Sequence, residues 1–285
     1  MSVRIISDST CDLSEELIKK YDVLVLPLHV MLGDEEYRDG KNISPDEIYR
    51  WSDAKKATPK TSAPSITDVM DVMHVCSEDD SDIICFSVSE QMSTSGNVMR
   101  MAAVEMGIEE RVHVIDSASL STGVGLLVIE AAVMAQKGCA AEEIVTYIES
   151  IKPYVRASFV VDTLTYLYRG GRCGGLTALA GGALKIHPRI VVEDGAMKPE
   201  KKYRGKLSNV ILNYVEDMEP QMRNAKRDRV FITHSGCDAE VIDKVYQYLE
   251  KLNIFDEILV TRAGSVISSH CGPGTLGVLF IEKKG

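Results

Sequence analysis

Four short polar segments of this chain could together bind a carboxylate. They are Thr-Ser-Ala-Pro-Ser at 61–65, Met-Ser-Thr-Ser-Gly at 92–96, Arg-Gly-Gly-Arg at 169–172 and His-Cys-Gly-Pro-Gly at 270–274. Each places hydroxyls, a guanidinium or an imidazole where the backbone must turn. Hydroxyls and an imidazole can hold a carboxylate through directed hydrogen bonds. A common site requires a fold that brings these distant segments together.

The first segment offers hydroxyls just before a helix start. Pro64 favours an extended backbone in front of it, and Ser65 is best interpreted as the N-cap of the helix that follows. Thr61 and Ser62 precede this cap, so their hydroxyls are free to meet a ligand. Taken alone, the segment favours an ordinary turn over a binding site.

The second segment carries three hydroxyls between a buried strand at 83–88 and a helix expected over 97–106. In an open α/β sheet, ligands bind beyond the carboxyl ends of the strands. A helix N-terminus there also offers free N–H groups and a positive dipole end to an anion. Capping by Ser93 or Ser95 needs one hydroxyl only, so binding and capping are about equally favoured.

The two later segments each have an ordinary structural explanation. Residues 169–172 end an expected helix, where glycine is the C-cap and Arg169 and Arg172 complement the helix dipole. This run lacks the P-loop pattern, which disfavours a nucleotide site. His270 falls between two late strands, where a lone histidine is more often a structural hydrogen-bonding residue than a catalyst. The glycines and proline after it imply a constrained backbone, which would fix the imidazole.

Motifs for other chemistries are missing from the sequence. It has no GxSxG elbow and no HExxH, which disfavours a hydrolase or a zinc peptidase. His234 and Cys237 supply only two potential ligands, so we expect no metal and no other cofactor. Asp8, Asp12 and Asp116 fall near strand ends and are candidate acidic site residues, although Asp12 is more simply a helix cap.

The composition is that of a soluble globular protein of one large or two ordinary domains. The chain has 285 residues, 45% hydrophobic and 26% charged, with a net charge of -10. The acidic balance argues against general nucleic-acid binding. The longest apolar stretch, 124–135, is too short to span a bilayer, and residues 1–8 lack the apolar core of a signal peptide. Seven scattered cysteines without a CxxC motif are typical of a reducing compartment. We therefore expect a cytoplasmic protein that is not integral to a membrane.

The first half of the chain alternates strands with helices. This pattern indicates a parallel sheet with helices on both faces. Strands are expected at 3–7, 23–29, 83–88 and 112–115, and helices at 14–21, from 44 onward, at 97–106, 121–136 and 141–151.

After Lys152 the pattern changes to a mixed α+β arrangement. Asp194-Gly195 between two apolar runs is a strong hairpin signal. Strands are expected at 158–161, 190–193, 196–198, 230–234, 258–262 and 275–281, and helices at 164–169, 207–224 and 239–252. We therefore predict two domains, 1–152 and 153–285.

In this order, the motifs resemble those of the DegV family, which includes the fatty-acid-binding subunits of bacterial fatty acid kinase. The similar segments are 7–13 (TDSTADL), 25–28, 37–40, 61–65 (TSxPS), 115–117, 163–172 (tLxyL and GGR), 194–206 (dG and RgK) and 270–274 (HxGPG). One segment departs from the family: its LSGTY is Met-Ser-Thr-Ser-Gly here. Ser93 matches the family's ligand-binding serine, and Ser95 is a second candidate.

The resemblance implies a two-domain α/β protein. Its N-terminal domain would be a Rossmann-like, EDD-type α/β/α unit with a parallel sheet, and its C-terminal domain mixed α+β. One long-chain fatty acid would lie between the domains, its carboxylate meeting Thr61 or Ser62, Ser93 or Ser95, and His270. A partner kinase would phosphorylate that carboxylate to an acyl-phosphate, so the protein would be a carrier and not an enzyme. Burial of the acyl chain, at about 0.8 kcal/mol per CH₂, would contribute roughly 10 kcal/mol.

Basic residues of the second domain are candidates for docking the kinase. For any one of these residues, the favoured interpretation is a role in solubility or in complementing the dipole at a helix end. As a cluster they could steer an acidic partner. The cluster comprises Arg169, Arg172, Lys201, Lys202, Arg204 and Lys206.

Two other functions stay open on the sequence alone. One is an enzyme or kinase subunit acting on a small hydroxylated or carbonyl substrate held by His270, by fold-level analogy with dihydroxyacetone kinases. The other is a structural adaptor. A deep, narrow, apolar tunnel would favour the carrier and a small polar pocket the enzyme, whereas no cavity near Thr61 and His270 would favour the adaptor. The sequence does not specify the acyl chain or the oligomeric state.

Overall fold

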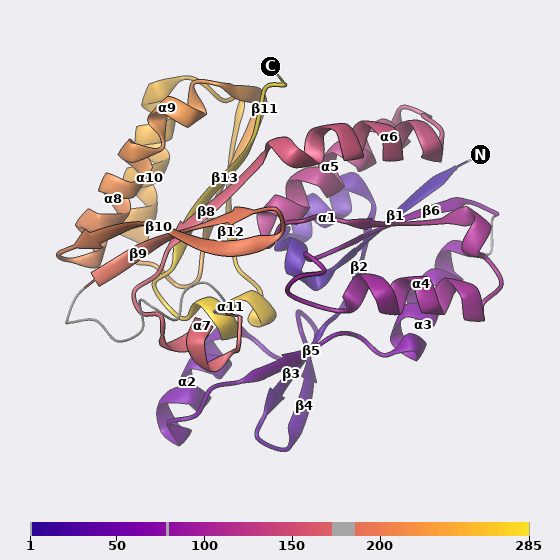
Figure 1. The fold of residues 1–285 in the computed structure, drawn as a ribbon, viewed down its shortest axis with the longest axis horizontal. Coiled ribbons are helices and arrows are strands. Elements are labelled where there is room, and N and C mark those ends of the chain that lie inside the picture. Colours follow the sequence, from indigo (N-terminus) through magenta and orange to yellow (C-terminus); the bar gives the residue numbers. More distant parts are fainter. Residues whose placement is uncertain (1, 78–79, 173–185, 285) are drawn as a thin grey trace.

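The N-terminal half of the molecule is built on a four-stranded sheet that is parallel throughout (Figure 1). The computed structural model describes residues 2–77, 80–172 and 186–284. The strand order is β2-β1-β6-β7, with β1 at Val3–Asp8, β2 at Val23–Leu26, β6 at Asp82–Ser87 and β7 at Val112–Asp116. The central strands are apolar and buried, as expected for a sheet covered on both faces.

Helices cover both faces of this parallel sheet. One face packs against α3 (Ile66–Ser77) and α4 (Ser95–Glu105). The other packs against α1 (Glu15–Tyr21), α5 (Thr122–Gln136) and α6 (Ala141–Ile151). A short 3-10 turn, Glu109–Arg111, precedes β7. The predicted parallel sheet with helices on both faces is confirmed.

The second sheet is mixed and has six strands in the order β10-β9-β8-β13-β11-β12. All neighbouring pairs are antiparallel except β11 with β12. The strands are β8 (Val155–Val160), β9 (Ile186–Glu193), β10 (Ala196–Arg204), β11 (Ala225–His234), β12 (Glu257–Arg262) and β13 (Leu276–Glu282). One core on this sheet includes residues of α8 (Leu207–Asp217), α9 (Glu219–Met222) and α10 (Ala239–Leu252). The predicted α/β fold with a mixed second sheet is thus confirmed.

Helix α5 lies between the two large sheets and joins their cores. It is apolar around most of its circumference and buried from Thr122 to Ala132, as expected of a helix packed on all sides. Its core contains residues of the parallel sheet, such as Phe86, together with Phe231 and Leu279 of the mixed sheet. A boundary near Lys152, within the 3-10 turn Lys152–Tyr154, stays a prediction.

A third, three-stranded sheet corrects the expected strand at 23–29. The chain leaves the parallel sheet after Leu26, because Pro27 has no N–H to donate to a ladder. The next strand, β3 (His29–Leu32), pairs antiparallel with β4 (Glu35–Arg38) and β5 (Lys60–Ser62). The following helix, α2 (Pro45–Lys55), starts with the predicted capping box between Ser44 and Glu47.

Two further predictions concern the second half. The expected helix at 207–224 is wrong in length, since α8 ends at Asp217 and the short α9 follows it. Pro220 accounts for the break, because it cannot donate a helical hydrogen bond. The hairpin at Asp194-Gly195 is confirmed, with both residues at positive φ. Its strands β9 and β10 are longer than expected.

Candidate functional site

A cavity of about 860 Å³, including its opening to solvent, lies between the parallel and the mixed sheet. Its wall includes segments that follow the carboxyl ends of β6 and β7, where ligands bind in open α/β sheets. Much of the wall is apolar, with side chains such as Leu120, Phe159, Leu167, Met197, Val266 and Leu279.

Four of the five predicted ligand-binding residues line this cavity: Thr61, Ser62, Ser93 and His270. The fifth, Ser95, is fully buried outside the wall, with its hydroxyl oxygen 2.8 Å from that of Ser93. The fold therefore brings residues of all four polar segments together, since Arg172 of the third segment also lines the wall, although the segments are far apart in the sequence.

Strand β5 positions Thr61 and Ser62. Both residues are held in register with β3, and Ser62 is exposed where it meets the cavity, so it marks the opening. The hydroxyl oxygen of Ser65 accepts a hydrogen bond from the Asp68 N–H at 3.1 Å. The predicted capping role of Ser65 is confirmed, and this cap joins β5 to α3.

His270 lies in the last turn of helix α11 (Ser265–Cys271), not on the expected turn. Its Nε2 is 2.7 Å from the Thr61 hydroxyl oxygen. Its Nδ1 is buried and has no hydrogen-bond partner among the described residues, and a Cβ added at Gly170 would lie 2.3 Å from it. The ring is therefore held between β5 and the end of α7 (Thr165–Arg169).

The imidazole of His270 is neutral at neutral pH. Burial, followed by the nearby Arg172 guanidinium, lowers the pKa of His270 to about 4. Both causes disfavour a second proton on the ring. His270 can therefore offer a directed hydrogen bond to a neighbouring group, but it supplies no positive charge to the cavity.

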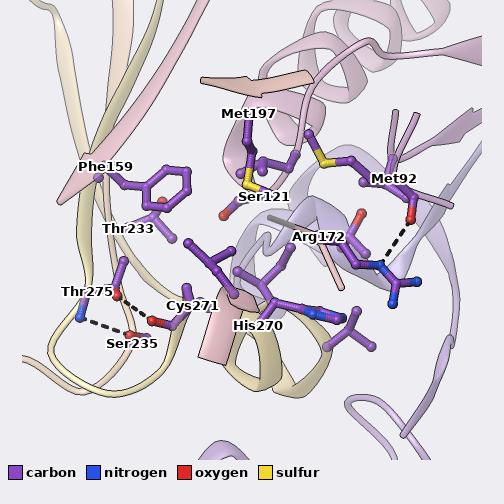
Figure 2. Close-up of a pocket in the computed structure, with 18 of the residues that line it drawn as sticks. Met92, Ser121, Phe159, Arg172, Met197, Thr233, Ser235, His270, Cys271 and Thr275 are labelled. Atoms are coloured by element: carbon purple, nitrogen blue, oxygen red, sulfur yellow. Dashed lines mark hydrogen bonds between the residues drawn. The ribbon is translucent and has the colours of Figure 1, made fainter. Parts of the chain in front are cut away.

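Arg172 brings the positive charge that His270 lacks. Its guanidinium donates to the Gly170 carbonyl at 2.8 Å. It also donates to the Met92 carbonyl at 3.4 Å (Figure 2). Within the described part of the chain these two acceptors are neutral, so no carboxylate offsets the charge. On the sequence alone, the guanidinium of segment 169–172 is among the groups that could bind a carboxylate, and Arg172 is also a docking candidate. The structure places Arg172 in the cavity wall.

Two buried carboxylates fasten the start of α11. Asp12 accepts the Gly264 N–H at 2.8 Å, and Asp39 accepts the Ser265 N–H at 2.7 Å. The expectation that Asp12 caps the following helix is wrong, because Ser14 caps α1. Both acids come from the N-terminal half, so they tie the helix that carries His270 to it.

Burial raises the pKa of both carboxylates, that of Asp12 well above its usual range. A third, Asp8, accepts hydrogen bonds from the backbone N–H groups of Val88 and Thr10 and precedes the 3-10 turn Ser9–Cys11. Burial raises the pKa of Asp8 to about 6, with Asp39 adding a smaller repulsion. These acids fasten elements around the cavity and do not line it.

The remaining basic candidates lie on the surface. Arg169 is exposed at the end of α7, and Lys202 and Arg204 are exposed on β10. Lys201, next to them, pairs with Asp217 at 2.5 Å. In the described ranges, no three His, Cys, Asp or Glu residues are grouped to hold a metal ion. No helix in those ranges is long and apolar enough to cross a membrane.

The whole chain matches one known protein family. The model of the family described as "Uncharacterised protein, DegV family" matches residues 2–283, so this chain belongs to the DegV family. A fatty-acid-binding DegV protein from Thermus thermophilus has a closely similar structure: the TM-score is 0.90 at 30% identity, covering 99% of this chain and 100% of that one.

Two further solved structures share the architecture. A stearic-acid-binding protein from Eubacterium ventriosum matches with a TM-score of 0.85 at 29% identity, over 99% of this chain and 98% of that one. The fatty acid kinase B3 protein of Streptococcus pneumoniae, loaded with linoleic acid, matches with a TM-score of 0.84 at 20% identity. It covers 99% of this chain and 100% of that one, and at this identity the likeness is one of fold.

Proposed function

We propose that this protein binds one long-chain fatty acid in the cavity between its predicted domains, 1–152 and 153–285. The observation that carries the proposal is a largely apolar cavity whose wall holds hydroxyls and the Arg172 guanidinium, which pairs with no carboxylate of the described ranges. The related proteins from Thermus thermophilus and Eubacterium ventriosum, both named for fatty-acid binding, support the ligand class.

The hydroxyls are arranged to donate to a carboxylate. The Ser93 oxygen accepts from the Ser95 N–H at 3.2 Å, and if the Ser95 hydroxyl donates to it across their 2.8 Å contact, the Ser93 proton is free for the ligand. If His270 carries its proton on Nε2, it donates to Thr61, and the Thr61 proton is free as well. Together with Arg172 these groups would surround the carboxylate with donors, and charge-assisted bonds of this kind are the stronger ones.

The apolar wall would hold the acyl chain without a covalent bond. Burial contributes about 0.8 kcal/mol per CH₂, or roughly 10 kcal/mol for a long chain. Such a wall supports a carrier over an enzyme that holds a small hydroxylated substrate at His270. The ligand itself would be the only small molecule required.

The exposed Ser62 places the carboxylate end near the surface. A cytoplasmic partner kinase could therefore phosphorylate the bound carboxylate to an acyl-phosphate, while this chain supplies no catalytic group. Exposed cations at Arg169, Lys202 and Arg204 would dock that partner. This step goes beyond the ligand proposal and has its own test in the Discussion.

Lipid extraction and mass spectrometry of the purified protein test the ligand proposal. We expect one long-chain fatty acid per chain, and rebinding of an added fatty acid after delipidation. If extraction finds no acyl chain and the delipidated protein binds none on titration, the proposal fails.

The hydroxyl arrangement gives a prediction for Thr61→Ala combined with Ser93→Ala. Each lost bond to a carboxylate costs about 1.5–3 kcal/mol, so the double variant should bind a fatty acid at least tenfold more weakly by competition titration. Binding of the methyl ester, which has no carboxylate, should change little. The exposed Thr67→Ala on α3 is the matched control. Equal losses for acid and ester would contradict the assignment.

A further inference from the structure

The loop between β6 and α4 is folded around one buried residue, Ser89. Its side chain is fully buried but lies outside the cavity wall. The Ser89 carbonyl accepts the Met92 N–H at 2.8 Å and the Ser93 N–H at 3.1 Å, and its hydroxyl oxygen accepts the Gln91 N–H at 3.2 Å. Ser89 thus sets the path of the loop that places Met92 and Ser93 in the cavity wall.

The same hydroxyl ties this loop to the mixed sheet. Ser89 donates to the Gly195 carbonyl at 2.7 Å, and the Gln91 amide donates to the Asp194 carbonyl at 2.5 Å. Asp194 and Gly195 form the turn of the β9–β10 hairpin. The contact is close, because a Cβ added at Gly195 would lie 2.6 Å from the Ser89 hydroxyl oxygen.

Both sides of this contact lead into the cavity. On one side, Met92 and Ser93 follow Ser89 in the loop; on the other, Met197 follows the hairpin turn, and all three line the wall. Strand β10 then continues to the exposed Lys202 and Arg204. Two hydrogen bonds, from Ser89 and Gln91, therefore join the loop that carries Ser93 to a hairpin of the mixed sheet.

We propose that Ser89 is a positioning residue: it holds the Ser93 hydroxyl toward the ligand's carboxylate and couples the binding of that carboxylate to the position of the β9–β10 hairpin. The proposal rests on the fatty-acid-binding function proposed above. Ser89 acts only through Ser93 and the turn at Gly195, since it does not meet the cavity itself. A displacement of the β9–β10 hairpin would therefore weaken the contact between Ser93 and the ligand's carboxylate before it affects the acyl chain.

A double-mutant cycle tests the link to Ser93. The variants are Ser89→Ala, Ser93→Ala and their combination, and each is titrated with a long-chain fatty acid and with the alcohol of the same chain. Ser89→Ala should weaken acid binding about tenfold and alcohol binding by less than about twofold. The double variant should match Ser93→Ala, because the two residues act in series.

Two results would overturn this role. One is an equal weakening of acid and alcohol by Ser89→Ala, which indicates general loosening of the cavity. The other is a double variant whose loss is the product of the single losses. Denaturant unfolding of each variant identifies any that fails to fold. If the native protein binds no fatty acid, the proposed function fails and this inference falls with it.

A glycine pair tests the link to the hairpin independently of Ser89 chemistry. Gly195→Ala and Gly205→Ala both place alanine at positive φ, +80° and +125°. Only the methyl at 195 meets Ser89, since no atom of the described residues lies within 4 Å of one at 205. Gly195→Ala should speed fatty-acid dissociation by about the same factor as Ser89→Ala, whereas Gly205→Ala should not. Equal dissociation rates for the two glycine variants would overturn the coupling.

Discussion

Buried titratable side chains give this site opposing responses to pH. Burial holds the pKa of His270 down at about 4 and raises that of Asp8 to about 6. Between pH 4 and 6.5 the histidine therefore favours the unfolded chain as acid is added, and the aspartate favours the folded one. Each effect can be isolated by a single substitution.

His270→Gln should remove a loss of stability on acidification. The ordinary histidine pKa is near 6.5. As the pH falls from 6.5 to 4, His270 is therefore protonated in the unfolded chain but stays neutral in the folded chain. The native protein loses up to roughly 3 kcal/mol in this window from that group. Urea unfolding at pH 7, 5.5 and 4.5 should show that the free energy of unfolding of the variant rises relative to that of the native protein as the pH is lowered. A difference that does not vary with pH would contradict the shifted pKa.

Asp8→Asn should have the opposite pH signature. The folded-state pKa of about 6 exceeds the ordinary value of 3.8, so the folded chain binds the proton more tightly, and stability falls as the pH rises from about 4 to 6. In the variant, the free energy of unfolding should no longer fall over this pH range, a change of at most about 3 kcal/mol. The variant also pays a pH-independent cost, because its hydrogen bonds to Val88 and Thr10 are altered. The measurement is the slope of unfolding free energy against pH; an unchanged slope would refute the prediction.

At the scale of elements, helix α11 depends on groups far away in the sequence. It is seven residues long, which is too short to be stable alone. Asp12 and Asp39 accept the N–H groups of Gly264 and Ser265 and so satisfy donors at its start. The position of His270 at its other end is therefore decided by carboxylates of the N-terminal half.

Asp39→Ala should loosen this helix. The substitution leaves the Ser265 N–H and the Ser9 hydroxyl without their acceptor, at about 1–3 kcal/mol for each buried donor. Hydrogen exchange of the α11 amides should speed up more than exchange in β7, at an edge of the parallel sheet. The control is Asp34→Ala, an exposed residue of the β3–β4 turn. Uniform acceleration over the whole chain would indicate global destabilisation instead.

At the scale of the whole molecule, charge is distributed unevenly. The chain carries a net charge of -10, yet Lys202 and Arg204 lie exposed together on β10. Cations on the surface of an acidic protein can steer an acidic partner, an effect that salt weakens. This surface is connected through the β9–β10 hairpin to the cavity wall at Met197.

Lys202→Glu combined with Arg204→Glu should leave fatty-acid binding intact and abolish acyl-phosphate formation with the cognate kinase. Lys19→Glu with Lys137→Glu, two exposed positions in α1 and after α5, applies the same charge change elsewhere. The assay is acyl-phosphate production from loaded protein at several salt concentrations. Unchanged turnover and salt dependence would reject docking on β10 while leaving the ligand proposal in place.

Local features of the fold were readable from the sequence because their causes are local. Ser44 with Glu47 predicted a helix start, and Asp194-Gly195 predicted a hairpin, through contacts among neighbours in the chain. Strand–helix alternation indicated the parallel sheet in the same way. The motifs also indicated Thr61 and His270 as candidates, because a hydroxyl and an imidazole there stand close in sequence to proline or glycine residues that constrain the backbone.

Other features were decided by contacts between distant segments. The sequence around His270 suggested a turn, but Asp12 and Asp39 make it a helix. Arg172 was predicted both within the carboxylate site and as a docking residue, and its hydrogen bond to the carbonyl of Met92, in the loop between β6 and α4, helps to hold it at the cavity. The sequence by itself determined which side chains could bind a carboxylate. Only the tertiary structure decided which of them meet, because burial and long-range hydrogen bonds depend on what the fold places beside each residue.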